Sequence, residues 1–297
     1  RDWGDQLGLK KLVGDLDYTK LRTPLTDLTD TEMGYCERDC HVVYTGILDH
    51  LKIYNDVFDI PLTSTGKVRR PTKELLTNDK EYMKEIKRLV PRDLEEYQMF
   101  QDVFQGGYTK ANRKYLDQII REPVYHTDIN SSYPFSLCAF KFPYNKWSYY
   151  GKVLPDPDTF EYRAYIIELH MTKVRVKSWN TYISASRCAG HKIISDNGRI
   201  LTADEIWTKV TEQDLLTILE HYEFETIEST GTWVCHKRYL PRIFIDYILD
   251  MYKAKTELKH VDDVKYSISK AHLNSLYGMC VSSLIYSDVV YNDDGNL

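Results

Sequence analysis

The chain has 297 residues, 42% of them hydrophobic, and its 44 acidic and 39 basic side chains leave a formal net charge of −5. This length allows one large domain or two or three small ones, and the charge argues against a uniformly basic nucleic-acid-binding protein. No apolar run approaches the ~20 residues of a membrane-spanning helix, and the first residues contain no apolar signal core.

Residues 1–60 are expected to end in a helix. Thr29-Asp30-Thr31-Glu32 matches a capping box, in which two side chains satisfy free backbone amides at the helix start. Apolar residues then recur at helical spacing: Cys36, Cys40, Val43, Ile47 and Leu51. Tyr35 and Asp39 lie four residues apart on a different stripe of the same helix.

A linker is predicted between Pro61 and Pro71, where Ser, Thr, Gly and basic residues gather. Residues 72–103 are charged and helix-prone, and the segment Phe104-Gln105-Gly106-Gly107-Tyr108 then interrupts the helical pattern. A strand ending at Asp128 is predicted from an alternating pattern, in which Val124, His126 and Asp128 alternate with Tyr125, Thr127 and Ile129.

Residues 145–240 indicate an inserted α+β subdomain, because strand-like runs such as Tyr162 to Met171 surround one predicted helix from about Thr202 to His221. Residues 242–280 predict two antiparallel helices joined at the polar tip Val261-Asp262-Asp263. The predicted apolar faces are Phe244, Ile248 and Met251 on the first helix and Val264, Ile268 and Ala271 on the second. Steps of four, four and three residues predict a separate face on the second helix, formed by Tyr266, Lys270, Asn274 and Tyr277.

The six cysteines include no Cys-x-x-Cys pair, so the sequence indicates neither a zinc ribbon nor a redox-active pair. We therefore expect a reduced, intracellular protein. One alternative stays open, a tetrahedral metal site formed by Cys188 with His191 and Cys235 with His236. Basic clusters such as Lys67, Arg69 and Arg70 could line a basic groove, although each also fits an ordinary solvated face.

Asp128 is the first candidate for chemistry. A carboxylate at the end of a strand offers the hard oxygen that Mg²⁺ prefers, and phosphoryl transfer needs such an ion between the attacking and leaving oxygens. Lys270 has the reach and the point charge to hold a phosphate oxygen. Tyr133, beside Pro134, could form the floor of a sugar pocket that selects deoxyribose.

Further candidates contact a base or a metal. Asn274 can hydrogen-bond a base edge, and Gly278 after Tyr277 lets a base pair approach closely. Tyr35 and Asp39 could hold a metal and orient a water, as a 3′–5′ exonuclease requires. Each candidate also has an ordinary structural explanation, namely a turn cap for Asp128, packing for Tyr133, a surface position for Lys270, a helix C-cap for Gly278 and a common spacing for Tyr35 and Asp39.

Two segments together resemble motifs A and B of family B DNA polymerases, in the form typical of the protein-primed branch of bacteriophages, adenoviruses and linear plasmids. Motif A in that branch reads Asp-x-x-Ser-Leu-Tyr-Pro, and the matching residues here are Asp128, Ser131, Tyr133 and Pro134, with Ser132 in place of leucine. Motif B reads Lys-x-x-x-Asn-Ser-Leu-Tyr-Gly, and the segment from Lys270 to Gly278 matches all of it.

Other segments resemble the family in the same order. Tyr35 to Asp39 is similar to the third exonuclease motif, Tyr-x-x-x-Asp, and Gly14-Asp15-Leu16-Asp17-Tyr18 before it is also similar to the family. Phe104 to Tyr108 resembles the Tyr-x-Gly-Gly motif, with Phe for Tyr, and Lys255-Thr256 resembles the Lys-Thr pair of the first fingers helix.

The resemblance implies an α+β polymerase with right-hand architecture that adds deoxynucleotides to a primer hydroxyl, first on a priming (terminal) protein and then on DNA. It implies two metal ions (Mg²⁺ or Mn²⁺), primer-template DNA and dNTPs as ligands, no membrane association and a monomer. The implied roles are metal binding by Asp128 and, in the exonuclease, by Asp39 with Tyr35; a sugar gate at Tyr133; triphosphate contacts from Lys255 and Lys270; base-pair contacts from Asn274, Tyr277 and Gly278; and DNA contacts from Gly106, Gly107 and Ser131.

The resemblance also implies a division of the chain. The expected parts are the end of an exonuclease domain (1–60), a linker and helical connection (61–103), the palm with motif A (104–140), a terminal-protein-related insertion (141–242), the fingers with motif B (243–282) and the start of a second insertion (283–297).

Several features of the family are missing. Motif C, Tyr-x-Asp-Thr-Asp-Ser, does not follow Gly278, the first two exonuclease motifs do not occur, Val13 replaces an exonuclease lysine, and Cys280 replaces an aromatic residue. The chain therefore resembles the middle of a polymerase, and we expect it to be inactive by itself because its two-metal site is incomplete. Two alternatives stay open: a non-catalytic relic that binds DNA or the priming protein, and a stand-alone exonuclease.

Overall fold

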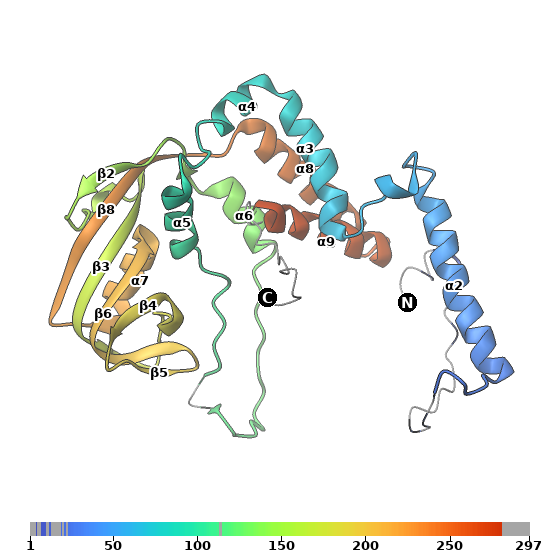
Figure 1. The fold of residues 1–297 in the computed structure, drawn as a ribbon, viewed down its shortest axis with the longest axis horizontal. Helices are drawn as coiled ribbons and strands as arrows, with labels where there is room; N and C mark the ends of the chain where they lie inside the picture. Colours follow the sequence, from blue (N-terminus) through green and yellow to red (C-terminus); the bar gives the residue numbers. More distant parts are fainter. Residues whose placement is uncertain are drawn as a thin grey trace, which may run out of the picture. The chain divides into compact units, whose positions relative to one another are not determined.

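The computed structural model describes residues 4, 7–9, 12, 19, 21, 23–112 and 115–280. The chain divides into two compact units, one formed by Arg1–Leu75 with Asp246–Leu297 and the other by Leu76–Ile245. The described residues form helices and an antiparallel sheet (Figure 1), so the predicted α+β class is confirmed. The segments 14–18 and 283–297, in which the sequence predicts exonuclease residues and a second insertion, lie outside the described residues.

The unit Leu76–Ile245 is built on an antiparallel sheet with the strand order β1-β8-β3-β6-β4. Strand β2 pairs with β8, β5 with β6, and β7 with β3. The strands are β1 (Phe142–Pro143), β2 (Ser148–Gly151), β3 (Arg163–Val176), β4 (Cys188–His191), β5 (Ile194–Asp196), β6 (Arg199–Thr211), β7 (Tyr222–Glu223) and β8 (Thr226–Arg238). The predicted strand-like run Tyr162 to Met171 is therefore confirmed as most of β3.

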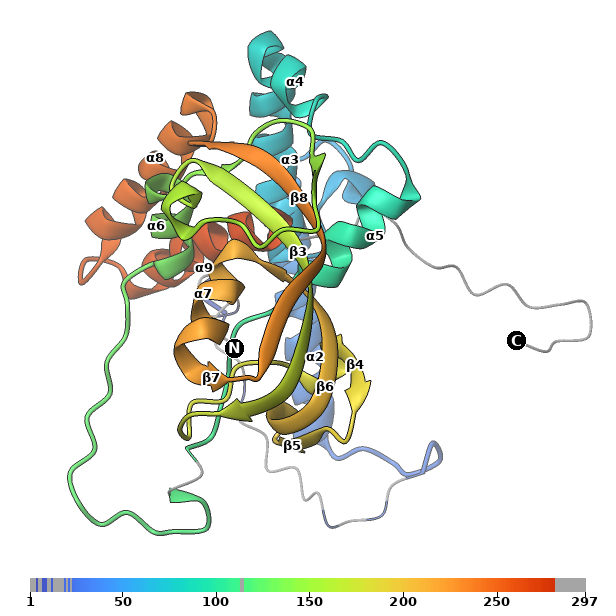
Figure 2. The same ribbon diagram turned by 90° about the vertical axis from the view of Figure 1, so that its left-hand side faces the viewer.

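One face of this sheet carries the core of the unit. Every second side chain of β3 is at most 1% exposed on that face, as the period of a strand requires: Tyr165, Ile167, Leu169 and Met171. Helix α7 (Glu212–His221) covers the same face through Leu215 and Ile218 (Figure 2). The unit Leu76–Ile245 thus has a hydrophobic core of its own.

The helix predicted from Thr202 to His221 is wrong in its first half. Residues 199–211 form β6, in which Ile206, Thr208 and Val210 alternate as buried positions, and α7 begins only at Glu212. A capping box marks that start, because the hydroxyl of Thr211 and the carboxylate of Asp214 satisfy each other's backbone amides. The alternation in front of the capping box was the sequence signal for a strand.

The helix-prone stretch 72–103 is confirmed, since it contains the end of α3 (Ser64–Asn78), α4 (Lys80–Ile86) and α5 (Leu94–Val103). The predicted linker between Pro61 and Pro71 is wrong from Ser64 onward, because α3 begins there. Val68, Thr72 and Leu76 follow each other at four-residue steps in α3 and are at most 6% exposed. Packing of this stripe outweighs a turn-like composition, including Pro71 inside the helix.

The other unit is helical in its described part. It contains α2 (Asp30–His50), the 3₁₀ turn η1 (Val57–Asp59), most of α3 and of α8 (Arg242–Leu258), and α9 (Asp263–Cys280). The predicted capping box starts α2, where the Thr29 amide donates to the Glu32 carboxylate at 2.9 Å. The two helices predicted for residues 242–280 are confirmed as α8 and α9.

On two helices of this unit burial does not follow the apolar spacing seen in the sequence. On α2 the cysteines and Val43 are exposed, whereas Gly46 is buried and Val42 lies 3.5 Å from the position of a Cβ on Gly4. On α9 Ile268 and Ala271 are exposed, whereas Leu273 and Leu276 are 1% exposed. In both helices several stripes have similar apolar content, so the neighbouring chain decides which one is buried.

In the part of the chain that the structure describes, no helix has both the length and the apolar character needed to cross a membrane.

Candidate nucleic-acid interface

Asp128 lies in an irregular segment and not in the predicted strand. Residues 118–129 form neither helix nor strand, and the chain turns at Asn130 and Ser131 into α6 (Ser132–Ala139) (Figure 1). An alternating pattern becomes a strand only beside a hydrogen-bonding neighbour, and the described residues supply none to this segment. The Asp128 side chain is exposed to solvent.

Ser131 sets the direction of the turn between Asp128 and Tyr133. Its φ of 51° and ψ of 49° lie in the left-handed region, which costs an L-residue roughly 1–2 kcal/mol. Ser131 is the N-cap of α6 and makes no side-chain cap hydrogen bond to the helix. Tyr133 follows two residues later in the first turn of α6, and 47% of its surface is exposed.

The structure brings Tyr133 together with the Gly-Gly segment. The Tyr133 hydroxyl lies 3.5 Å from the position that a Cβ on Gly107 would take. A Cβ on Gly106 would meet no described atom within 4 Å, so this backbone is open on the side where a side chain would stand. These two sequence-predicted sites thus form one local surface in the unit Leu76–Ile245.

The motif B residues belong to the other unit. On α9 the side chains of Lys270 and Asn274 are exposed and that of Tyr277 is partly exposed, beside the stripe of the buried Leu273. A Cβ on Gly278 would meet no described atom within 4 Å. Lys255 on α8 is only 8% exposed, and its ammonium lies 4.9 Å from the centre of the Tyr252 ring, a distance typical of a cation–π contact.

The predicted exonuclease residues both lie on α2. Tyr35 and Asp39 are half-buried and one helical turn apart. No three His, Cys, Asp or Glu side chains gather into a metal site within the described residues. Asp128 and Asp39 therefore belong to no such group there, and the four Cys and His side chains of the alternative metal site are not gathered.

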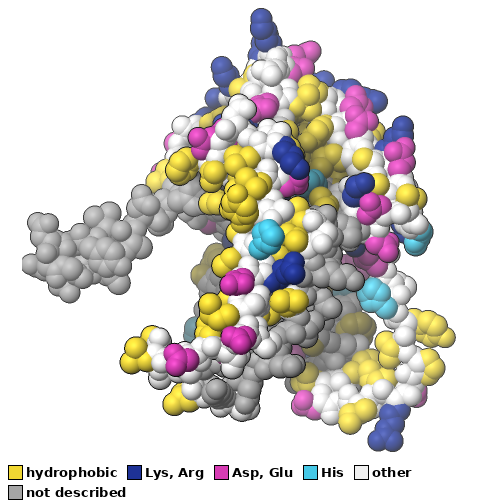
Figure 3. All heavy atoms as spheres, turned by 90° about the vertical axis from the view of Figure 1, so that its right-hand side faces the viewer, with side chains coloured by type: hydrophobic (Ala, Val, Ile, Leu, Met, Phe, Trp, Pro, Cys, Tyr) yellow, Lys and Arg dark blue, Asp and Glu magenta, His cyan; other side chains and the backbone are white. Residues whose placement is uncertain are grey.

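Charge is mixed on the surface. Figure 3 shows one face, on which Lys and Arg side chains alternate with Asp and Glu instead of forming a patch of one sign. In the predicted basic cluster at 67–70, Arg70 pairs with Asp59 at 3.3 Å and with Glu74 at 3.4 Å. Its neighbour Lys67 lies 3.0 Å from Nε2 of His50, and burial together with that ammonium lowers the pKa of His50.

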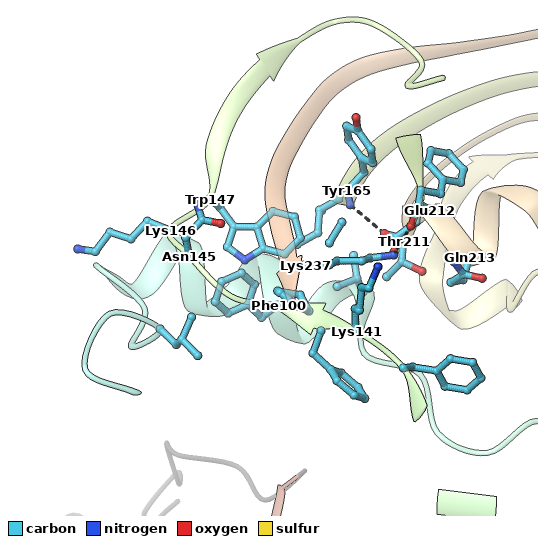
Figure 4. Close-up of a pocket in the computed structure, with 18 of the residues that line it drawn as sticks. Phe100, Lys141, Asn145, Lys146, Trp147, Tyr165, Thr211, Glu212, Gln213 and Lys237 are labelled. Carbon is cyan, nitrogen blue, oxygen red and sulfur yellow. Dashed lines mark hydrogen bonds and ion pairs between the residues drawn. The ribbon is translucent and has the colours of Figure 1, made fainter. Parts of the chain in front are cut away.

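Sequence reasoning missed a cavity of about 860 Å³ in the unit Leu76–Ile245 (Figure 4). Phe100 and Trp147 form an aromatic wall, with ring centres 6.0 Å apart. Deeper in the cavity Glu212 and Lys237 form an ion pair, and Glu212 also accepts a hydrogen bond of 2.8 Å from the Tyr165 amide. No local pattern could have indicated this cavity, because its walls come from segments far apart in the sequence.

Comparison with known proteins decides the family. Residues 6–297 match the family described as DNA polymerase type B, organellar and viral. This chain belongs to the type B DNA polymerases. The predicted family is therefore confirmed.

The relatives agree with this assignment. The DNA polymerases of Bacillus phages PZA and phi29 are each 24% identical over 287 residues, a match that covers 93% of this chain and 45% of theirs. The phi29 polymerase bound to primer-template DNA has the same fold, with a TM-score of 0.67 at 21% identity over 95% of this chain. A phi29 complex that also holds incoming nucleotides gives a TM-score of 0.64 at 20% identity over 93%. The chain spans about half the length of these relatives, 45% to 46%.

Proposed function

We propose that this chain forms the motif A and motif B part of a DNA-directed DNA polymerase that starts synthesis on a priming protein. The observation that carries the proposal is the pair of segments from Asp128 to Pro134 and from Lys270 to Gly278, in this order, in a chain of the type B family. The phi29 relative, which was solved with primer-template DNA and incoming nucleotides, supports the same substrates for this chain.

In this proposal Asp128 provides one ligand for a catalytic Mg²⁺ or Mn²⁺ ion. Its exposed carboxylate has the hard oxygens that such an ion requires. The described residues do not fit a complete metal site, because no group of three His, Cys, Asp or Glu side chains forms among them. The remaining ligands would have to come from substrate phosphates, from water or from residues outside the described part. When bound, the ion would stabilise charge on the transferred phosphoryl group.

The other motif residues would bind the nucleotide and the DNA. Lys270 and Asn274 are exposed on α9 and accessible to a ligand, which supports phosphate and base contacts for them. Tyr133 would be the sugar gate and Ser131 a DNA contact, and the open backbone at Gly106 and Gly107 supports contact with the template strand. Lys255 would also contact the triphosphate, and Tyr277 and Gly278 would contact the base pair.

The remaining parts of the proposal rest on the family alone. Tyr35 and Asp39 would belong to a 3′–5′ exonuclease, and residues 141–242 would contact the terminal protein. We propose a monomer that acts inside the host cell. The parts expected from the sequence would end at residues 60, 103, 140, 242 and 282.

The decisive experiment is primer extension by the full natural polymerase that contains this chain, with Asp128→Asn. We expect loss of synthesis with unchanged binding of a fluorescent primer-template duplex, because the metal ligand is lost while the DNA contacts remain. Asp158→Asn is the matched control, since its carboxylate is equally exposed on the insertion, and it should leave synthesis intact. Full synthesis by Asp128→Asn would show that motif A is wrongly assigned.

A further inference from the structure

The inserted subdomain holds the chain in front of the Gly-Gly segment. Arg187, which ends the 3₁₀ turn η4 (Ala185–Arg187), donates hydrogen bonds to the carbonyls of Gln101 (2.9 Å) and Asp102 (3.2 Å), in the last turn of α5. Carbonyls at a helix C-terminus lack intrahelical partners and attract cations. Lys209 of β6 adds an ion pair of 2.9 Å with the Asp102 carboxylate.

The same subdomain holds the chain behind the Gly-Gly segment. The Tyr108 hydroxyl donates to the Thr181 carbonyl at 2.5 Å. The Arg199 guanidinium lies 5.0 Å from the centre of the Tyr108 ring and donates to the Tyr182 carbonyl at 2.8 Å. Two residues after Tyr108, the Lys110 ammonium donates to the carbonyl of Trp179. The backbone from 103 to 107 therefore spans two fixed points on one folded body.

Glycine at position 106 has no explanation within the described protein. Neither Gly106 nor Gly107 adopts a left-handed φ, so backbone conformation does not require glycine. A Cβ on Gly106 would meet no described atom, so packing does not require it either. Without a side chain at this position, a ligand can come close to the backbone.

We propose that the inserted subdomain is the frame that positions Gly106 and Gly107 opposite Tyr133, with Arg187 and Arg199 as the positioning residues. The ligand placed by this frame is the single-stranded template strand, and this part rests on the proposed function. Neither arginine would touch the template in this arrangement. Each arginine instead holds one end of the Gly-Gly segment, and that segment contacts the template.

The test combines hydrogen–deuterium exchange at the end of α5, up to the Phe104 amide, with binding of DNA by the chain itself. The variants are Arg187→Ala and Arg199→Ala, with Arg199→Lys and Tyr108→Phe as conservative replacements. Arg175→Ala is the control, because Arg175 is an exposed arginine on β3 outside both anchors. The DNA probes are a fluorescent primer-template with a single-stranded template overhang and the same duplex with blunt ends.

We expect each alanine variant to speed exchange of the Phe104 amide, which donates to the Phe100 carbonyl at 3.2 Å, by up to about tenfold, as the loss of a charged hydrogen bond of ~1.5 kcal/mol implies. Affinity for the overhang substrate should fall several-fold, while binding of the blunt duplex stays unchanged and the melting temperature falls by no more than about 6 °C. Arg199→Lys should restore part of the protection, and Tyr108→Phe should keep the ring contact and lose the hydrogen bond.

Unchanged exchange in both alanine variants, with normal binding of the overhang by the unmodified chain, would overturn the frame and leave the proposed function standing. Faster exchange in a chain that binds neither probe would instead overturn the role in template binding together with the proposed function. Faster exchange with selective loss of overhang binding supports the proposal.

Discussion

The buried ion pair between Glu212 and Lys237 is a sharp test of how the unit Leu76–Ile245 is stabilised. Their side chains are 7% and 9% exposed, Lys237 also donates to the Phe160 carbonyl at 2.8 Å, and Glu212 accepts from the Tyr165 amide. Replacing Glu212 by Gln keeps the size and an acceptor for that amide but leaves the lysine charge buried without a counter-charge. Breaking a buried pair in this way costs roughly 3–5 kcal/mol, and we expect about 3 kcal/mol because the amide partner survives.

The assay is urea unfolding followed by tryptophan fluorescence. Four of the five tryptophans lie in the insertion, at positions 147, 179, 207 and 233, so the signal reports mainly on this subdomain. For a unit of this size, 3 kcal/mol corresponds to a drop in melting temperature of roughly 6–12 °C. The control is Glu161→Gln, whose carboxylate is 83% exposed in its pair with Lys141 and should cost less than about 0.5 kcal/mol. A cost below about 1 kcal/mol for Glu212→Gln would refute the conclusion that this ion pair is shielded from water.

Three further predictions concern the same subdomain. His170 lies between the carboxylates of Glu228 (2.8 Å) and Glu205 (2.7 Å), whose hydrogen bonds raise the pKa of His170. The stability gained from these bonds is present below the pKa that His170 has in the unfolded chain, and it is lost as pH rises through the pKa in the folded chain. In urea titrations His170→Asn should therefore destabilise the protein more at pH 5.5 than at pH 8.5. A Cβ on Gly190 would stand 2.3 Å from the carbonyl oxygen of Glu205, so Gly190→Ala should detach β4 from β6 and speed amide exchange there, and unchanged exchange would contradict the register. Ile167 is fully buried, and Ile167→Ala should lower the free energy of unfolding by about 2–5 kcal/mol, with Ile194→Ala on the surface as a near-neutral control.

Local signals in the sequence were enough for part of the fold. The capping box at Thr29 located the start of α2, and alternation located β3, because both features depend on residues a few positions apart. The sequence was misleading where local and tertiary preferences compete. Position 71 is the clearest case, since a proline normally ends a helix, yet α3 continues through it while Val68 and Thr72 are buried on one stripe.

The strand predicted at Asp128 failed for a different reason. Its alternating residues are all exposed in the structure, and a strand needs hydrogen bonds from a neighbour that the described residues do not provide. The cavity and its buried ion pair could not be predicted at all, because Glu212 and Lys237 meet only after β3, β6 and β8 have paired. Long-range pairing of this kind leaves no periodic trace in the sequence.

Packing explains the residues of the insertion but not those of the two motifs. Ile167 and Met171 are apolar because they fill a core, and any residue with the same shape would serve there. Asp128, Lys270 and Asn274 are exposed, so the described protein does not determine what they are. Ser131 even adopts a backbone conformation that costs energy, beside the carboxylate that the family resemblance singles out. The fold thus does not require the Asp128 side chain, and it must compensate the strain at Ser131. Both features are expected of a surface that binds a ligand.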